Sequence, residues 1–189
     1  MNVAPGWAMD EGMSEIKSTV QVWPGEIFSL FQKFGIHQVS YVPDAGHAEL
    51  IGRCAADPAI RTVPLTTEEE GVALSAGAWL GGQRAVLLMQ SSGVGNCVNM
   101  LSLIANGRFP FLTLVTMRGE WGEENGWQNP MGQATPGAFA LMGVHVLRAD
   151  NVADVAPAVE AGLGMAFNGG GAVAVLLSQR LLGAKSFSK

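Results

Sequence analysis

The 189-residue sequence predicts an α/β fold, a three-layer sandwich in which roughly six parallel strands are covered by helices on both faces. Short apolar runs alternate with helical patterns along the chain, and these runs are continuous instead of alternating between apolar and polar residues. Continuous apolar strands are typical of a parallel sheet that is buried on both faces. We expect a single domain over residues 21–185, after a poorly ordered leader at residues 1–20.

The elements of this fold have their own start and stop signals. The first helix is expected to begin near Trp23 and to end at Gly35, because glycine commonly terminates helices. Pro43 and Asp44 stop the first strand. The strands are expected at residues 38–42, 61–64, 85–89, 111–116, 144–147 and 172–177, and the later helices at 47–56, 68–81, 94–105, 136–142 and 152–167. Residues 117–133 have no regular period and contain two tryptophans, which is typical of a functional loop.

The composition argues against several classes of protein. A net charge of −5 argues against binding to nucleic acid or to anionic membranes, which select basic surfaces. No apolar run approaches the roughly 18 residues of a membrane span and no signal peptide is visible, so we expect a cytoplasmic protein. Cys54 and Cys97 are expected to be buried free thiols. Only 14% of the residues are charged, which favours a large interface with another subunit.

Three consecutive acids, Glu68, Glu69 and Glu70, open one of the predicted helices. At helical spacing Glu69 shares a face with small apolar residues, whereas Glu68 is expected to point outward. Thr67 and Glu70 have the spacing of a capping box. A helix that began at Thr66 would instead make Glu69 the capping acid. Because a buried carboxyl group needs a partner, Glu69 is a candidate functional residue.

Three further candidates follow the ends of predicted strands, where parallel sheets bind ligands. The segment QSSGVGN at residues 90–96 has two possible interpretations, a tight turn or an anion-binding site. It matches neither a dinucleotide fingerprint nor a P-loop. His47 has either a structural role or a direct role as proton shuttle or polariser. Arg118 either forms a surface ion pair with Glu120 or receives an acidic substrate group. No histidine or cysteine has the spacing of metal ligands.

These motifs, in this order, resemble the pyrimidine-binding domain of thiamine-diphosphate-dependent decarboxylases. EEEGVALSAGAWL at residues 68–80 resembles the family's pyrimidine-binding helix, and alignment on its AGAW segment places the family's glutamate on Glu69. MQSSGVGN at 89–96, with Pro110 beyond it, resembles the next strand and its GxGN…P helix. VPD at 42–44 and the RGE…MG loop that starts at Arg118 resemble sulfopyruvate decarboxylase α subunits and phosphonopyruvate decarboxylases. The resemblance extends from about residue 24 to about residue 180.

The resemblance implies an α subunit that uses thiamine diphosphate to decarboxylate an acidic 3-substituted pyruvate, either sulfopyruvate or phosphonopyruvate, to an aldehyde. It also implies that a β subunit holds the diphosphate and Mg²⁺, because the family's Gly-Asp-Gly…Asn motif is absent from this sequence. A homo-oligomer or hetero-oligomer is therefore expected. The alternatives are another thiamine-diphosphate reaction of 2-oxoacids, such as carboligation, and a non-catalytic subunit for assembly or regulation.

The resemblance and the strand-end positions together give the candidate site. The catalytic candidates are Glu69 and His47. The cofactor-binding candidates are Glu69, Gln90, Ser91, Ser92, Gly93, Gly95 and Asn96, and the substrate-binding candidates are Asp44, His47 and Arg118. Glu69 is expected to hydrogen-bond the aminopyrimidine of the cofactor and to favour its imino tautomer.

Overall fold

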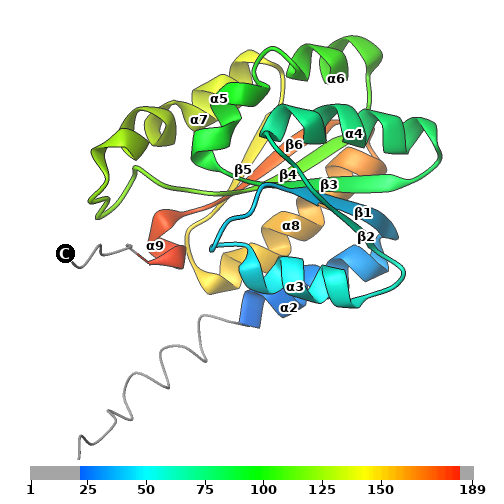
Figure 1. Cartoon of the computed structure of the whole chain (residues 1–189), viewed down its shortest axis with the longest axis horizontal. Coiled ribbons are helices and arrows are strands. Elements are labelled where there is room, and N and C mark those ends of the chain that lie inside the picture. Colours follow the sequence, from blue (N-terminus) through cyan, green and yellow to red (C-terminus); the bar gives the residue numbers. More distant parts are fainter. Residues whose placement is uncertain (1–21, 184–189) are drawn as a thin grey trace, which may run out of the picture.

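A six-stranded parallel sheet with the strand order β2-β1-β3-β4-β6-β5 forms the centre of the computed structural model (Figure 1). The structure describes residues 22–183, so the leader expected at residues 1–20 lies outside the described residues. The strands are β1 (Ile36–Tyr41), β2 (Arg61–Pro64), β3 (Arg84–Gln90), β4 (Phe111–Thr116), β5 (His145–Ala149) and β6 (Ala172–Leu177). All neighbouring strands pair in parallel, which confirms the predicted fold class.

Helices cover both faces of the sheet, and each face has its own apolar core (Figure 1). One face carries α2 (Val22–Lys33), α3 (Ala48–Ala56) and α8 (Val152–Phe167), and the other carries α4 (Glu68–Leu80), α5 (Val94–Cys97), α6 (Leu101–Gly107) and α7 (Asn129–Leu141). Along β3, Leu88 faces the first core and Leu87 the second, because successive side chains of a strand point to opposite faces. Cys54 and Cys97 are buried and free, as predicted. Within residues 22–183, no helix has the length and apolar character that crossing a membrane requires.

The helix predicted at residues 94–105 is divided in the structure. The 3₁₀ turn η1 (Ser91–Gly93) leads into α5, and a turn at residues 98–100 separates α5 from α6. In that turn the N–H of Leu103 bonds to the carbonyl oxygen of Met100 at 2.9 Å, so the hydrogen bonds tighten from four-residue to three-residue spacing. A single helix was therefore the wrong prediction for this segment.

The helix predicted at residues 136–142 begins earlier than expected, at Asn129. Pro130 lies in its first turn, where the missing N–H leaves no hydrogen bond unmade, and the helix continues through Pro136. The loop after β4 is shorter than predicted for this reason, and it contains the 3₁₀ turn η2 (Gly126–Gln128). Gly132 lies against this loop, since a Cβ added there would be 1.9 Å from the carbonyl oxygen of Arg118.

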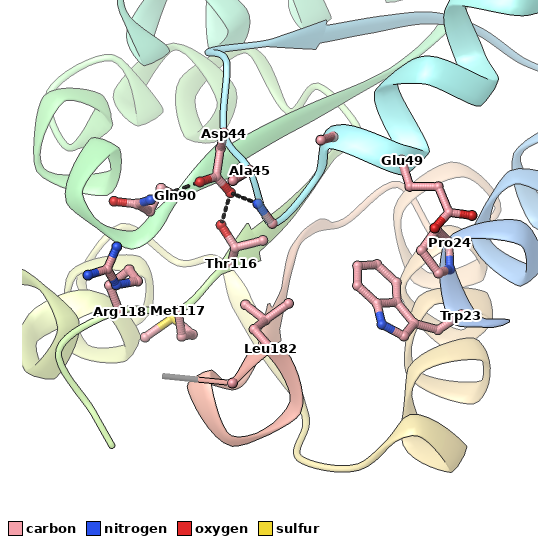
Figure 2. Close-up of a pocket in the computed structure, with 13 residues that line it drawn as sticks. Trp23, Pro24, Asp44, Ala45, Glu49, Gln90, Thr116, Met117, Arg118 and Leu182 are labelled. Carbon is pink, nitrogen blue, oxygen red and sulfur yellow. Dashed lines mark hydrogen bonds between the residues drawn. The ribbon is translucent and has the colours of Figure 1, made fainter. Parts of the chain in front are cut away.

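The carboxyl ends of β1, β3 and β4 meet at one edge of the sheet, as the parallel arrangement requires. Asp44 follows β1, whereas Gln90 and Thr116 are the last residues of β3 and β4, and hydrogen bonds join the three side chains (Figure 2). The helix α9 (Gln179–Leu182) follows β6 at the same edge (Figure 1). This edge therefore gathers polar side chains from segments far apart in the sequence.

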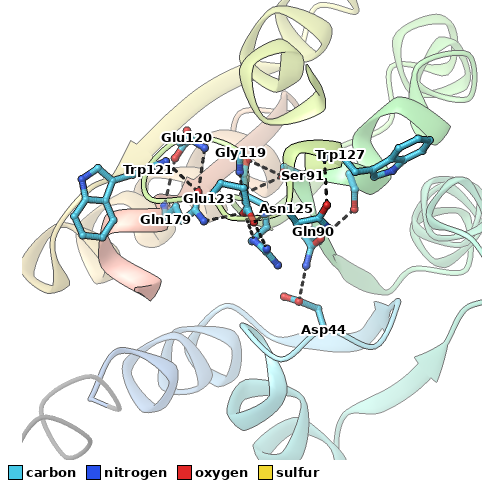
Figure 3. A network of polar contacts seen from close by, with 12 residues as sticks. Asp44, Gln90, Ser91, Gly119, Glu120, Trp121, Glu123, Asn125, Trp127 and Gln179 are labelled. Atoms are coloured by element: carbon cyan, nitrogen blue, oxygen red, sulfur yellow. Dashed lines mark hydrogen bonds and ion pairs between the residues drawn. The ribbon is translucent and has the colours of Figure 1, made fainter. Parts of the chain in front are cut away.

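Figure 3 shows the polar network around Glu123 and Gln179 that holds the loop after β4. Within it, Arg118 and Glu123 form an ion pair. The carboxylate of Glu123 accepts hydrogen bonds from Nε and Nη2 of Arg118, both at 2.5 Å, and the side chains are only 9% (Arg118) and 3% (Glu123) exposed. The side chain of Gln179 donates to the same carboxylate at 2.9 Å, and its oxygen accepts from the N–H groups of Glu120 and Trp121. The loop is thus tied to both β4 and α9.

Two glycines on opposite faces of α4 show how closely this helix approaches the sheet. A Cβ added at Gly71 would lie 2.4 Å from Cδ1 of Leu87 and 2.9 Å from Cδ1 of Leu65, so only glycine fits there. A Cβ added at Gly77 would meet nothing within 4 Å. The face of α4 that carries Gly71 is therefore fixed against the sheet.

This contrast predicts opposite effects of the same substitution. Gly71→Ala should lower the free energy of unfolding by about 1 to 3 kcal/mol, because the added methyl group overpacks the contact with Leu87 and Leu65. Gly77→Ala should raise it by about 0.5 to 1 kcal/mol, since alanine favours a helix and the site has space. Urea unfolding of the two variants measures both effects. Effects of equal sign and size would contradict the described position of α4.

The buried ion pair predicts a pH-dependent contribution to stability. Hydrogen bonds from the Arg118 guanidinium lower the pKa of Glu123 from 4.5 to about 2. The stability that this carboxylate contributes is therefore present above about pH 4.5 and is lost as the pH falls toward about 2. Glu123→Gln should reduce the free energy of unfolding by about 3 kcal/mol at pH 7, and this difference should shrink across that pH range.

Urea unfolding followed by tryptophan fluorescence at pH 7, 5, 4 and 3 measures this difference. Glu160→Gln is the matched control, because Glu160 pairs with Lys33 at 2.6 Å on the surface, where an ion pair contributes about 1 kcal/mol or less. A Glu123→Gln difference that stays constant from pH 7 to pH 3 would show that the ion pair is not its source.

Candidate active site

The carboxylate of Asp44 joins the ends of three strands (Figure 2). It accepts hydrogen bonds from Nε2 of Gln90 at 2.9 Å, from Oγ1 of Thr116 at 2.6 Å and from the N–H of Gly46 at 3.1 Å. A Cβ added at Gly46 would lie 2.7 Å from Cγ2 of Thr116, so the turn after β1 needs glycine to come this close to β4. Two of the predicted site residues, Asp44 and Gln90, are therefore in direct contact.

A cavity of about 310 Å³ opens beside Asp44, between the strand ends and α2, α3 and α9 (Figure 2). Its volume is at the lower end of the range of ligand pockets, so it could hold only a small molecule. The charged and polar lining residues are Asp44, Glu49, Gln90, Thr116 and Arg118, and the aromatic one is Trp23. Of these, the sequence analysis missed Trp23, Glu49 and Thr116. Thr116 ends a predicted strand, so its position at a strand end could have identified it. No sequence motif identifies Trp23 or Glu49 as site residues.

Arg118 lines this cavity, as its predicted role in substrate binding requires (Figure 2), but its guanidinium already has an ion-pair partner. Glu123 occupies its Nε and Nη2 atoms and raises the pKa of Arg118, whereas Nη1 makes no hydrogen bond within residues 22–183. The surface ion pair between Arg118 and Glu120, one of the two alternatives predicted for Arg118, does not form. Glu120 pairs instead with Arg148, at 2.6 Å and 2.9 Å.

His47 does not line the cavity. Its side chain is fully buried, and its Nε2 lies 3.1 Å from the carbonyl oxygen of Leu114 in β4. Nδ1 is buried without a hydrogen-bond partner in the described part of the chain. Burial lowers the pKa of His47, which favours the neutral ring. Within residues 22–183, no contact supports the predicted role of His47 in catalysis or substrate binding.

The acid buried at the start of α4 is Glu68, not Glu69. The Glu68 side chain is 8% exposed, whereas Glu69 is half-buried and Glu70 is exposed. The prediction that Glu69 faces inward was wrong because it counted only apolar residues, and the buried face of α4 also includes Gly71 and Ser75. Glu68, Gly71 and Ser75 follow one another at three-residue and four-residue spacing, which is the spacing of one helical face.

Each of the three acids has a different hydrogen-bond partner. Oε2 of Glu68 accepts from Nδ2 of Asn96 at 2.9 Å. Glu69 accepts from the hydroxyl of Thr67, which lowers the pKa of Glu69. Glu70 accepts from the N–H of Thr66 at 2.9 Å, so the capping box predicted for Thr67 and Glu70 does not form. These contacts leave Glu68 as the carboxyl group that packs beside residues 90–96.

The residues predicted from the QSSGVGN segment do not share one role. The hydroxyl of Ser91 is buried and accepts from the N–H of Arg118 at 3.0 Å, so it links β3 to β4, and the hydroxyl of Ser92 donates to Gln90 at 3.2 Å. Gly93 is buried against Glu68, whereas Gly95 and Asn96 are exposed. The residues nearest to the buried carboxyl group are thus Gly93 and Asn96.

Among residues 22–183, no group of three or more His, Cys, Asp or Glu side chains is arranged to hold a metal ion. The charged groups at this edge of the sheet have other partners. Arg118 pairs with Glu123, and Asp44 accepts hydrogen bonds from Gln90 and Thr116.

Several proteins of known activity are similar in sequence to this chain. The sulfopyruvate decarboxylase subunit alpha of Methanothermobacter thermautotrophicus is 40% identical over 110 residues, which are 58% of this chain and 67% of that subunit. The same subunit of Methanococcus maripaludis is 39% identical over 53% of this chain and 61% of its own length. The phosphonopyruvate decarboxylase of Streptomyces viridochromogenes is 41% identical over 48% of this chain and 23% of that enzyme. No family model matches the sequence.

The structure is similar to that of a 2-oxoglutarate:ferredoxin oxidoreductase from Magnetococcus marinus, with a TM-score of 0.66 over 85% of this chain and 29% of that one. At 17% identity this likeness shows the fold alone. The sequence relatives show more, although the match spans only 61% of the first α subunit and 67% of the second. On its 40% identity across that 67%, the chain belongs to the family of sulfopyruvate decarboxylase α subunits.

Proposed function

We propose that this chain is the α subunit of a thiamine-diphosphate-dependent decarboxylase that acts on an acidic 3-substituted pyruvate, sulfopyruvate or phosphonopyruvate, and releases an aldehyde and carbon dioxide. The relatives named sulfopyruvate decarboxylase and phosphonopyruvate decarboxylase support the substrate class. The observation that carries the proposal is the carboxyl group of Glu68, which is buried at the start of α4 beside the turn that follows β3. A buried carboxyl group without an ionic partner is costly unless a ligand completes its contacts.

The residues around Glu68 fit the aminopyrimidine ring of thiamine diphosphate. Asn96 occupies Oε2 of Glu68, whereas Oε1 has no hydrogen-bond partner in the described part of the chain. A ring nitrogen that carries a proton is the donor that such an oxygen lacks. When bound, the cofactor supplies the carbanion that attacks the 2-oxoacid carbonyl. The role of Glu68 is to hold the aminopyrimidine ring through Oε1 and to keep the proton on the ring nitrogen that it contacts.

We assign this role to Glu68 and not to Glu69, which the resemblance had indicated. Glu68 is buried and packs against Gly93, whereas Glu69 is half-buried and already accepts a hydrogen bond from Thr67. The two residues are adjacent on a helix, so they point in directions about 100° apart and cannot both face one ring. The catalytic role of Glu69 stays a prediction. It was based in part on the expected burial of Glu69, and the buried acid in the structure is Glu68.

The cavity beside Asp44 is proposed to receive the substrate. Arg118 lines this cavity, and its Nη1 atom, which makes no hydrogen bond within residues 22–183, could donate to a sulfonate, phosphonate or carboxylate oxygen. Glu123 keeps the guanidinium in place by its two hydrogen bonds. Two carboxylates, Asp44 and Glu49, line the same cavity. An anionic substrate therefore needs more positive charge than the lining residues within 22–183 supply, and we propose that the partner subunit provides it.

The partner is proposed to be a β subunit that carries the diphosphate-binding domain and holds Mg²⁺. The names of the relatives, which are alpha subunits, support a partner. The exposed indoles support it as well, since Trp127 is 85% and Trp121 is 51% exposed in the loop that holds Arg118. On this account the chain alone contains half of an active site and binds thiamine diphosphate weakly.

The test compares Glu68→Gln with Glu69→Gln in the chain assembled with its partner subunit. Glu68→Gln should lower the rate of carbon dioxide release from sulfopyruvate by about 100-fold or more, because it removes the carboxylate that fixes the proton on the ring. Glu69→Gln should keep the rate within about threefold, since its carboxylate serves a local contact with Thr67. Size-exclusion chromatography confirms that both variants assemble.

Two outcomes would contradict the proposal in different ways. An inactive Glu69→Gln beside an active Glu68→Gln would return the catalytic role to Glu69. Near-normal turnover in both variants would show that the carboxyl group at the start of α4 takes no part in the reaction.

A further inference from the structure

The contact between Glu68 and Asn96 joins two helices that are far apart in the sequence. Nδ2 of Asn96, in α5, donates to Oε2 of Glu68, in α4, at 2.9 Å. Hydrogen bonds between an amide and a carboxylate are stronger than those between neutral groups. The two residues differ in exposure, because Glu68 is 8% exposed whereas Asn96 is on the surface. The amide therefore reaches inward to a carboxyl group that solvent barely contacts.

Gly93 makes the space that the carboxyl group of Glu68 occupies. A Cβ added at Gly93 would lie 2.2 Å from the carboxyl carbon and 2.2 Å from Oε1 of Glu68, which is far inside van der Waals contact. Any other residue at this position would push the carboxyl group away. Gly93 thus fixes where the carboxyl group lies by leaving room for it, and Asn96 fixes its rotation by holding one oxygen.

We infer that Asn96 is a positioning residue for Glu68, which holds Oε2 so that Oε1 is left for the aminopyrimidine ring of the cofactor. This inference rests on the proposed function. It replaces the expectation that Gly93 and Asn96 contact the cofactor themselves, because both act on Glu68 in the structure. Asn96 suits this role because its amide is a hydrogen-bond donor that carries no charge.

The charge and hydrogen-bonding character of residue 96 then control the affinity for thiamine diphosphate. Asn96→Asp has almost the same shape but replaces the donor with a second carboxylate, which repels Glu68. Asn96→Ala removes the donor without adding a charge, so its effect should be smaller. Asn99→Asp is the matched control, because Asn99 is also exposed, lies three residues further along the chain and makes no side-chain hydrogen bond within residues 22–183.

The experiment uses the assembled complex and two readouts besides activity. Calorimetric titration measures the Kd for thiamine diphosphate, and circular dichroism of the bound cofactor reports its imino tautomer. Asn96→Asp should raise the Kd by about 10-fold or more and reduce the tautomer signal, and Asn96→Ala should have a smaller effect of the same kind. Asn99→Asp should leave the Kd within about twofold of the unchanged complex. The Tm of the cofactor-free complex should fall only slightly in Asn96→Asp and Asn96→Ala, because one hydrogen bond to Glu68 is lost, and it should not change in Asn99→Asp.

Failures of the inference and of the proposed function are distinguishable in this design. If the unchanged complex binds thiamine diphosphate and Asn96→Asp binds it equally well with the same tautomer signal, Asn96 does not position Glu68 and only the inference is overturned. If the unchanged complex does not bind thiamine diphosphate, the proposed function and the inference both fail. A fall in Tm that accounts for the weaker binding would show that Asn96 serves the fold instead.

Discussion

The close approach of α4 to the sheet determines which of its three acids is buried. Gly71 lies where any side chain would collide with Leu87, and the hydroxyl of Ser75 bonds to the Gly71 carbonyl oxygen at 2.8 Å. The approach of Gly71 to Leu87 fixes the rotation of the helix about its axis, whereas the Ser75 bond lies within the helix. With that rotation set, Glu68 points inward and Glu70 points to solvent. The burial of Glu68 is therefore a consequence of how α4 packs against β3 at Gly71, less than one turn of helix further along.

A second constraint is the balance of charge at the carboxyl edge of the sheet. Asp44 accepts hydrogen bonds from neutral donors at the ends of β3 and β4, beside the cavity. Arg118 is the cation on the same lining, but Glu123 already offsets its charge. The described residues that line the cavity therefore supply little net positive charge for an anionic ligand. The geometry thus supports a site that a partner subunit completes, and it does so independently of the relatives' names.

Much of the fold could be predicted because it depends on strong local signals. The apolar runs at residues 111–116 and 172–177 match β4 and β6 in both bounds, since buried parallel strands are continuous and short. The edge on which Asp44 and Gln90 meet also followed from the sequence, because all parallel strands end on one side. The division between α5 and α6 did not, as it depends on tertiary packing and no glycine or proline marks it.

The side chains of the site were harder to predict than its backbone. His47 follows a strand end as expected, yet the turn directs its ring to the carbonyl oxygen of Leu114 in β4 and not to the cavity. The partner of Arg118 could not be read from spacing, because Glu120 and Glu123 are both near it in sequence and only the loop conformation selects Glu123. Counting Gly71 and Ser75 as part of the buried face would have identified Glu68, since small residues pack against a sheet as well as apolar ones do.

The central claim is that Glu68 is the carboxyl group that meets the cofactor. The most direct measurement is an experimental structure of the chain assembled with its β subunit and thiamine diphosphate. The account predicts Oε1 of Glu68 within about 3 Å of the protonated ring nitrogen of the aminopyrimidine, with Asn96 still bonded to Oε2. A structure in which Glu69 makes that contact, or in which neither acid reaches the ring, would contradict it.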